Sequence, residues 1–438
     1  MILILLMGYL SVLMPDPSIK AQKRIDNEEL TLPYGFLPLF EDTNTLDISF
    51  YSVIDTVRYL QICPTIKQRF GKWGGEVSPY LRWGGDYYYP RRKKFGVYSD
   101  VIRGSLFYKN NSILFSFGKD VFSMGSAFEN NAFLSPNIPL DYLSFTLKKP
   151  KFAFIHFISR LEDYEGVEFA WNDTTSGELI NMNRYLGIHR LEIKPIKWFA
   201  FSISEVMLIG GEGLGLPFEL LTPLTIYYVE QHNRKKNTNI LWNIDMIAVK
   251  GKFLYYFDLF IDDFQYEEDP WKEPNHIGLY CGIQSKDFPF KNSEIFVSYN
   301  LMTRWVYDNI LVWQRYLEKG MPIGSSLGGD YDRFTFKYLH IISDFKLGAM
   351  FSYTRRGENQ ITTPWPVNTY ASASSENEFE GTNFLSGTIE KRLTLAPIFM
   401  YKELFEIAPG LSYYENYKHE QEETKILPAI ELKLKYKI

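Results

Sequence analysis

Cysteine is nearly absent from this sequence of 438 residues, which contains only Cys63 and Cys281, far apart and outside any motif. That count excludes a disulfide framework and a zinc site built from several thiolates. Long hydrophobic runs are missing too. After the N-terminal region, no segment reaches the roughly 18 consecutive apolar residues that indicate a transmembrane helix. A membrane protein with this sequence would therefore have to be a closed β-barrel.

Catalytic and cofactor motifs are also lacking. There is no G-x-S-x-G, and the six histidines are scattered without H-x-H or H-E-x-x-H spacing. The glycine-rich stretch 210–217 lacks G-x-G-x-x-G spacing and runs into a proline, which favours a loop over a phosphate site. We therefore expect no catalytic residue, no metal and no cofactor. A hydrolase would need His189 beside Ser202 or Ser204, a pair from neighbouring strands.

Strong charge of either sign is the remaining absence, because the net charge is only -5 and 23% of the residues are charged. This gives no reason to expect a nucleic-acid partner, which would call for a basic domain. Aromatic residues, in contrast, make up 17% of the chain, with 34 Phe and 31 Tyr. Such a composition excludes a disordered chain and favours one large β architecture.

Apolar and polar residues alternate along many segments of about ten residues, among them 293–305, 345–355 and 425–437. Successive side chains of a strand point to opposite faces, so each of these segments has one apolar and one polar face. A strand of about ten residues also crosses a bilayer at a tilt. We predict about sixteen strands, near residues 75–84, 97–108, 112–118, 141–147, 152–162, 184–194, 198–208, 239–249, 253–263, 275–285, 293–305, 332–342, 345–355, 384–400, 405–416 and 425–437.

The connections between these strands alternate in length. Short turns are expected at 109–111, 148–151, 195–197, 250–252, 286–292, 343–344 and 401–404. Longer loops are expected at 85–96, 119–140, 163–183, 209–238, 264–274, 306–331, 356–382 and 417–424. All short connections then lie at one end of the hairpin array, as in outer-membrane barrels, which have short periplasmic turns and long extracellular loops. The pattern predicts an all-β fold, a transmembrane antiparallel up-and-down barrel in the bacterial outer membrane.

The chain divides into three parts. Residues 1–22 contain an apolar core of signal-peptide length followed by small residues, which favours a cleaved signal peptide. Residues 23–74 are either a periplasmic or lumen-plugging segment or one further hairpin. Residues 75–438 form the barrel, whose last strand, 425–437, turns its apolar face to lipid and pairs with the first strand.

Several polar residues raise questions about the lumen. Arg190 and other charged residues on inward faces either form a network that holds the lumen shut or line a solute pathway. Glu205 does not fit this scheme, because it shares a strand face with Phe201 and Ile203. Asp330 and Asp332 have a spacing that suits calcium, but we prefer a structural role in which they pair with arginines.

Aromatic and basic residues in the outward loops are candidates for binding sugars. Sugar rings stack on aromatic rings, so these residues form a saccharide surface or, alternatively, the aromatic girdle that barrels carry at membrane interfaces. The candidates that we select are Tyr88, Arg91, Arg92, Trp271, Trp313 and Trp365.

Five stretches resemble the Wzi-type capsule assembly barrels. They are "LFSFGKDVFSMGSAFENNAFLSPNIPLDYLSF" (114–145), "HRLEIKPIKWFAFSISEVMLIGG" (189–211), "LLTPLTIYYVEQHN" (220–233), "GMPIGSSLGGDYDRFTFKY" (320–338) and "YTRRGEN" (353–359). The resemblance implies an outer-membrane barrel of about eighteen strands with a blocked lumen, so we expect 16–18 strands and occlusion by loops or by the N-terminal segment. It also implies a surface lectin that helps to assemble or attach capsular or exopolysaccharide. We further expect a monomer that is not an enzyme.

The same resemblance implies a polar network drawn from the family motifs, made of Arg190, Glu205, Gln231, Asn233, Asp330, Asp332, Arg333, Arg356 and Glu358. The expected partners are surface polysaccharide and the lipid and lipopolysaccharide of the outer membrane. The alternative is a porin-like diffusion channel for small solutes or oligosaccharides.

Overall fold

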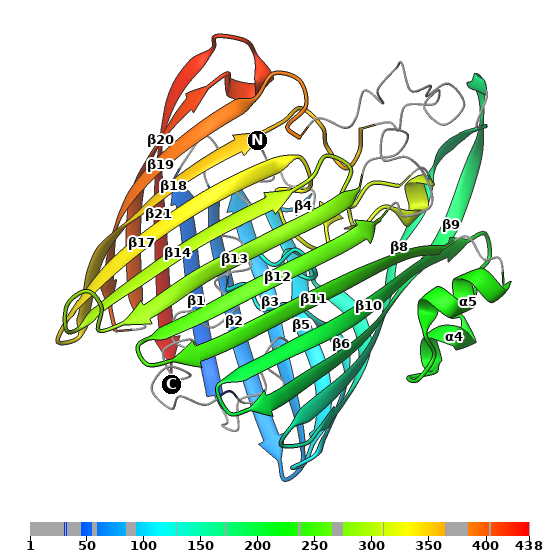
Figure 1. Ribbon diagram of the computed structural model, residues 1–438, viewed down its shortest axis with the longest axis horizontal. Coiled ribbons are helices and arrows are strands. Elements are labelled where there is room, and N and C mark those ends of the chain that lie inside the picture. Colours follow the sequence, from blue (N-terminus) through cyan, green and yellow to red (C-terminus); the bar gives the residue numbers. More distant parts are fainter. Residues whose placement is uncertain are drawn as a thin grey trace.

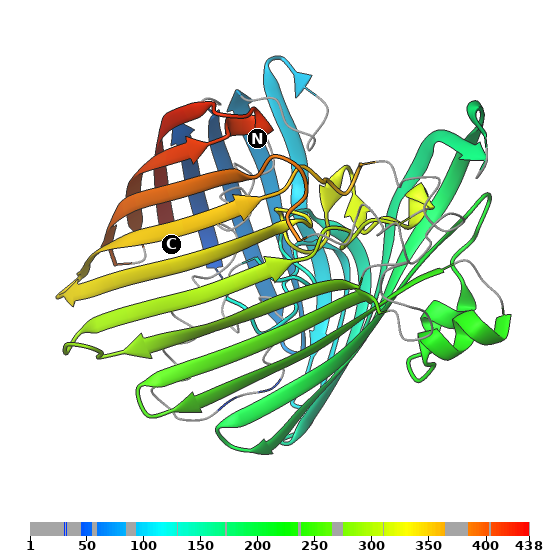
Figure 2. The same cartoon turned by 45° about the horizontal axis from the view of Figure 1, so that its top comes forward.

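The structure is a computed structural model, and it describes residues 30, 32, 45–54, 59–84, 93–128, 130–170, 173–234, 238–264, 275–309, 311–363, 384–402 and 404–437. Long tilted strands surround an interior that is entered by loops from one end (Figure 1). A second view shows the same strands as a continuous wall (Figure 2).

Eighteen long strands form this wall in the described part of the chain. They are β1 (Thr45–Ile54), β2 (Tyr59–Phe70), β3 (Trp73–Gly84), β5 (Val97–Lys109), β6 (Ile113–Asp120), β7 (Leu140–Lys148), β8 (Phe152–Ala170), β9 (Asp173–Ile196), β10 (Phe199–Gly211), β11 (Thr238–Lys250), β12 (Phe253–Asp263), β13 (His276–Lys286), β14 (Ser293–Met302), β17 (Tyr331–Ile342), β18 (Phe345–Arg356), β19 (Glu390–Tyr401), β20 (Phe405–Glu415) and β21 (Thr424–Lys437).

The remaining elements are short. A two-residue strand, β4 (Lys93–Lys94), pairs with β5, and β15 (Leu317–Glu318) pairs with β16 (Met321–Pro322) in a separate hairpin. In the described residues the helices are α4 (Phe218–Leu221), α5 (Tyr227–Arg234) and the 3₁₀ turns η1 (Val312–Gln314) and η2 (Tyr417–His419). None of the described helices is long and apolar enough to cross a membrane.

The wall closes on itself. Each long strand pairs antiparallel with the next, and β21 pairs with β1 in a register that sets Tyr436 opposite Ile48 and Ile430 opposite Ile54. Closure leaves no free sheet edge along these strands, which is the condition for a sheet to lie in a bilayer. The prediction of an antiparallel barrel of 16–18 strands closed by the C-terminal strand is confirmed.

The strands differ from the predicted ones at two places. The hairpin β1–β2 belongs to the sheet, so the barrel begins at Thr45 and not near residue 75, and the further hairpin is the alternative that the structure contains. The predicted loop 163–183 is instead the upper part of β8 and β9, which pair as far as Ala170 and Asp173 and rise beyond the rim in Figure 1. A hairpin beyond the apolar band needs only its ladder of backbone hydrogen bonds, so its sequence lacks the alternation by which we recognised strands.

The two faces of the wall have opposite character. Along β3, Val77, Leu81 and Trp83 are exposed on the outer face, whereas Ser78 and Tyr80 are buried on the inner face. Next to the short turns, the outer face carries exposed aromatic side chains at Phe70, Trp73, Phe152, Trp198, Phe288 and Phe345. A band of apolar side chains edged by aromatic rings is typical of barrels that span a bilayer.

Candidate functional site

The connection 121–139, between β6 and β7, turns into the barrel. Its apolar side chains Phe122, Met124, Phe133 and Leu134 are buried against inward-facing residues of the wall. The backbones of Met124 and Leu134 bond to each other, which closes the connection into a compact loop. An apolar loop of this kind fills space that would otherwise be an aqueous channel.

The connection 303–330, between β14 and β17, also folds inward and is bound to the wall. The guanidinium group of Arg184 donates to three of its carbonyl oxygens, those of Trp313 at 2.6 Å, Arg315 at 2.8 Å and Leu317 at 2.9 Å. Charge-assisted hydrogen bonds of this kind are among the strongest in proteins. One buried arginine of β9 therefore fixes the middle of this loop against the wall.

The two inward loops hold each other. Asn130 Nδ2 donates to Ser325 Oγ at 2.8 Å, and the Asn130 side-chain oxygen accepts from Ser326 N at 2.7 Å. Asn137 Nδ2 donates to the carbonyl oxygens of Pro322 and Gly324, at 3.0 and 2.5 Å. We call loops 121–139 and 303–330 together the plug. Its apolar side chains contact inward residues of the wall from β2 to β17.

Within loop 303–330, the carboxyl group of Asp308 is buried. Its Oδ1 accepts from Arg315 Nε at 2.7 Å, while Oδ2 is buried without a hydrogen-bond partner in the described part of the chain. Burial raises the pKa of Asp308 to about 7, although the guanidinium of Arg315 acts in the opposite direction.

Two N-terminal residues also lie inside the wall. Leu30 and Leu32 are buried against Ala153, Ala200 and other small or apolar side chains of β8 to β12. Leu30 N donates to the Lys197 carbonyl oxygen at 2.9 Å. The lumen thus receives side chains from both inward loops and from this N-terminal pair.

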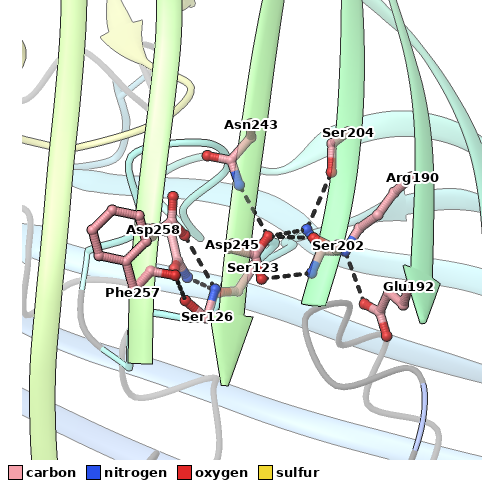
Figure 3. A network of polar contacts seen from close by, with 11 residues as sticks. Ser123, Ser126, Arg190, Glu192, Ser202, Ser204, Asn243, Asp245, Phe257 and Asp258 are labelled. Carbon is pink, nitrogen blue, oxygen red and sulfur yellow. Dashed lines mark hydrogen bonds and ion pairs between the residues drawn. The ribbon is translucent and has the colours of Figure 1, made fainter. Parts of the chain in front are cut away.

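A buried charge network lies on the inner wall beside the plug (Figure 3). Arg190 donates to both carboxylate oxygens of Asp245, at 2.6 and 3.0 Å, and to Glu192 Oε1 at 2.8 Å. Asp245 also accepts from Ser202 Oγ at 2.5 Å and from Asn243 Nδ2 at 3.0 Å. All five side chains are inaccessible to solvent. The bidentate geometry compensates the cost of burying these charges.

The network extends to the plug. On β12, Asp258 lies directly opposite Asp245, and its Oδ2 accepts from the backbone N–H of Ser126 at 3.1 Å. Ser126 Oγ donates to the Phe257 carbonyl oxygen at 2.9 Å. The plug is therefore attached to the wall by polar bonds near the centre of the barrel as well as by apolar contacts (Figure 3).

A second charge cluster lies on strands β2 to β6. Arg103 pairs with Glu76 at 2.8 Å and with Asp120 at 3.1 Å, and Lys67 lies 3.7 Å from Glu76. Arg103, Glu76 and Asp120 are all buried on the inner face. The charged inward residues of these two clusters thus pair with one another, as the first of our two alternatives, a network inside the lumen, requires.

Asp330 and Asp332 lie near the end of the barrel that carries the long connections, but their carboxylates contact different residues. Asp330 accepts from Ser386 Oγ at 2.5 Å and from Asn359 N at 3.1 Å, so it joins the plug to both ends of the connection between β18 and β19. Asp332 instead accepts from Tyr299 Oη at 3.0 Å and pairs with Arg355 on the outer face. The two carboxylates do not converge, and the described residues contain no group of three or more His, Cys, Asp or Glu that could hold a metal ion.

Glu205 lies on the outer face of β10, beneath the helical connection. Its two carboxylate oxygens accept from the backbone N–H groups of Tyr227 and Tyr228, each at 2.8 Å, at the start of α5. His189 is its cross-strand neighbour and stacks on Tyr227, with ring centroids 4.2 Å apart. Ser202 and Ser204 are on the inner face, so they do not meet His189 as a hydrolase would require.

A match to a known family covers most of this architecture. Residues 65–395 match the family described as capsule assembly protein Wzi. The chain belongs to the Wzi family. The resemblance that we found in the sequence is thereby confirmed, and the plugged barrel is the fold in which its motif residues are placed.

Solved structures agree on the fold. The chain is similar to Wzi of Escherichia coli, described as an outer membrane protein involved in group 1 capsule assembly and as a carbohydrate-binding β-barrel, with 12% identity, a TM-score of 0.58 and coverage of 96% of this chain and 89% of that chain. It is also similar to OccD3 (OpdP) of Pseudomonas aeruginosa, with 9% identity, a TM-score of 0.50 and coverage of 97% and 98%. No curated protein matches the sequence.

The residues that we selected from the Wzi-family motifs do not form one network. Arg190 is in the central network, Glu205 is outside the wall, and Asp330 and Asp332 serve separate contacts. The others are distributed as follows: Gln231 donates to the Thr238 carbonyl oxygen, Asn233 is exposed at the end of α5, Arg333 donates to Thr354 Oγ1, Arg356 is buried, and the exposed Glu358 accepts from Thr388 N.

The residues selected as sugar-facing are mostly beyond the described part of the chain. Trp313 is described and is buried within the plug, so its ring is not presented to solvent. Tyr88, Arg91, Arg92, Trp271 and Trp365 lie outside the described residues.

Several residues that organise the interior escaped our sequence reasoning. Arg184 binds the plug to the wall, Asn130 and Asn137 hold the two plug loops together, and Asp245 is at the centre of the buried charge network. Asp245 had a usable signal, because it alternates with apolar residues in "NIDMIA" and so had to face inward. Asn130 and Asn137 had no such signal in the sequence, because their partners are backbone groups and hydroxyls far away in the sequence.

Proposed function

We propose that this member of the Wzi family is an outer-membrane barrel that binds a surface polysaccharide, capsular or exopolysaccharide, and helps to assemble or attach it at the cell surface. The observation that carries the proposal is the plug. Loops that pack against each other and against the wall make the barrel a rigid support, not an open conduit. Binding at the rim is then the activity that such a scaffold supports best.

The rim with the long connections is the surface that we assign to the outside of the cell. Outer-membrane barrels have short periplasmic turns and longer extracellular loops. In this chain the short turns include 71–72, 251–252 and 343–344, and all of them lie at the same end. The opposite rim carries the connection with the exposed Lys93, Lys94 and Phe95, next to Arg91 and Arg92 in the sequence.

The proposed chemistry at this rim is binding without catalysis. Aromatic rings stack on the apolar faces of sugars, and basic side chains pair with acidic sugar units. The closed wall has no free strand edge to pair with a second barrel, which supports a monomer surrounded by lipid and lipopolysaccharide. The paired inward charges favour a closed lumen over a solute pathway.

Direct binding tests the proposal. The purified barrel should retain the surface polysaccharide of its own organism in a pull-down or surface-binding assay, and a neutral polymer such as dextran should not be retained. Replacing Arg91 and Arg92 together by Ala should weaken this binding at least several-fold. Arg160→Ala, a matched change at an exposed arginine that pairs with Asp163, should leave it unchanged. Equal retention of dextran would contradict specific binding.

The porin-like alternative is favoured by one observation, the similarity in fold to OccD3 (OpdP). It predicts stepwise conductance when the purified barrel is inserted into planar lipid bilayers. The plugged barrel should instead show almost none. Conductance of the size expected for a channel would replace our proposal by the diffusion function.

A further inference from the structure

The connection 212–237 between β10 and β11 differs from the other described connections, because its two helices lie outside the barrel. Figures 1 and 2 both show α4 and α5 beside the outer wall, below the raised end of the β8–β9 hairpin. Leu220 and Tyr227 are buried against outward-facing side chains of the wall, among them Met207 and Ile209. We call α4 and α5, with the residues that join them, the outer insert.

The wall beneath the outer insert is built to receive it. Gly187 on β9 has no side chain, and a Cβ there would lie 2.6 Å from side-chain atoms of both Leu220 and Tyr227. The carboxylate of Glu205 accepts the first two backbone N–H groups of α5, where it compensates donors that no helical carbonyl can satisfy. The outer insert is therefore fixed to the wall by both shape and hydrogen bonds.

The same patch of wall carries polar side chains. His156, His189 and Glu205 come from three adjacent strands and face outward side by side. All three are nearly inaccessible to solvent because the outer insert and its neighbours cover them. A charged side chain on the lipid side of a barrel is destabilising, most of all at the bilayer centre and less near the interfaces. The outer insert removes that cost by separating these side chains from lipid.

The side of the outer insert that faces away from the wall is apolar. Phe218 is 81% exposed, Leu224 is 85% exposed and Ile226 is 56% exposed. Leu216, Leu221 and Val229 are exposed as well. This apolar surface continues the outer face of β10, where Ile203 is exposed and Phe199 and Phe201 are partly exposed. The outer insert thus replaces a polar patch of wall by an apolar surface that is continuous with the lipid-facing band.

We propose that the outer insert is a lipid-binding element, held against the wall by Glu205 and Gly187, with Phe218, Leu224 and Ile226 in the acyl-chain and headgroup boundary of the leaflet at the long-connection end. Short helices with an apolar face bind at this depth in membranes. Continuity with the apolar outer wall selects lipid as the occupant. The inference requires the barrel to be in a bilayer but does not require it to bind a polysaccharide.

Quenching by labelled lipids tests the proposal. Single cysteines at Phe218 and Leu224 are introduced into a Cys281→Ser background, in which the buried Cys63 remains native, and each is labelled with bimane. Ile203→Cys on the outer wall is the lipid-facing control, and Phe95→Cys, at a position 94% exposed in the β4–β5 turn, is the aqueous control. The barrels are placed in phosphatidylcholine nanodiscs that contain lipid with a nitroxide near the headgroup end of the acyl chain.

Labels at Phe218 and Leu224 should be quenched to the same extent as the label at Ile203, and several-fold more than the label at Phe95. Quenching no stronger than at Phe95 would overturn the proposal. Labels shielded from both the lipid nitroxide and aqueous iodide would also overturn it, because they would place a second protein on this surface.

A second measurement uses the unmodified chain. In bilayers that contain a lipid with a photoreactive acyl chain, adducts should form within residues 216–229 as well as on outward residues of β10. Adducts on β10 without any in 216–229 would contradict the assignment, independently of whether the cysteine variants fold.

Discussion

At the scale of single residues, buried charges are the most demanding feature of the barrel interior. Arg190, Asp245 and Glu192 are completely inaccessible to solvent and compensate one another through short hydrogen bonds. Taking one charge away leaves the others buried without compensation, which costs far more than the pair contributes when it is intact. The stability of the wall therefore depends strongly on each member of the network.

We expect Arg190→Leu to lower the free energy of unfolding by about 3–5 kcal/mol, because Asp245 and Glu192 lose the cation that they share. Arg160→Leu is the matched control, since Arg160 pairs with Asp163 at the surface, and its cost should stay within about 1 kcal/mol. Urea unfolding in detergent, followed by tryptophan fluorescence, measures both. Equal midpoints for the two variants would show that the buried network contributes no more than a surface pair.

Glu205 is the second case in which a single side chain organises its surroundings. Glu205→Leu should loosen the start of α5, because the amide groups of Tyr227 and Tyr228 lose their acceptor. Hydrogen exchange of these two amides should accelerate. Glu205→Gln, which keeps one acceptor, should have an intermediate effect, and Glu212→Gln, an exposed glutamate of the same connection, should have none. Unchanged hydrogen exchange of these two amides in Glu205→Leu would contradict the capping of α5 by the Glu205 carboxylate.

At the scale of elements, period-two alternation and turn length were sufficient to predict the strands. The sixteen predicted segments all correspond to strands in the structure, because each has to present an apolar face outward and a polar face inward. The hairpin β1–β2 was one of two alternatives that we gave for residues 23–74. We missed the extension of β8 and β9, because the alternation of apolar and polar residues stops beyond the apolar band.

The plug was beyond prediction in any detail, although we did expect occlusion by loops or by the N-terminal segment. Loop 121–139 contains apolar residues without a strand or helix period, and what they contact depends on tertiary packing. The position of Glu205 was noticed as an inconsistency in the strand pattern. Only the outer insert, which lies between β10 and β11 in the sequence but clusters with side chains from β8 to β11, explains it.

The docking of loop 303–330 should depend on pH through Asp308. Because burial raises the pKa of Asp308 above its unfolded value, the folded loop binds its proton more tightly, so its stability falls as pH rises from about 4 to about 7. Hydrogen exchange in this loop, corrected for intrinsic rates, should therefore show less protection at pH 8 than at pH 5. Asp308→Asn should abolish the difference, and a difference that persists in this variant would exclude Asp308 as its origin.

Removing one half of the plug should open the barrel. Replacing residues 123–137 by a short Gly-Ser turn deletes the partner of loop 303–330 and the contact with Asp258. Conductance in planar bilayers should then rise well above that of the unmodified barrel. Shortening 417–423, a connection at the same end that does not contribute to the central core, serves as the control. Equal conductance of all three proteins would mean that the plug is not the barrier.

At the scale of the whole molecule, the closure of the wall and the filling of the lumen act together. The pairing of β21 with β1 satisfies the backbone of the wall, the outer face carries a band of apolar side chains, and the lumen is occupied by two loops and the N-terminal pair Leu30 and Leu32. Such a molecule holds its rim in a fixed arrangement in the membrane. We therefore place the proposed activity of this member of the Wzi family at the rim.

The central claim is that this barrel holds a polysaccharide at the cell surface, and the ratio of cell-attached to shed polysaccharide tests it most directly. The ratio is measured in a strain that lacks the protein and again after complementation. Deletion should shift polysaccharide from the attached to the shed fraction without reducing the total, and complementation should restore attachment. A ratio that does not change on deletion would contradict the account.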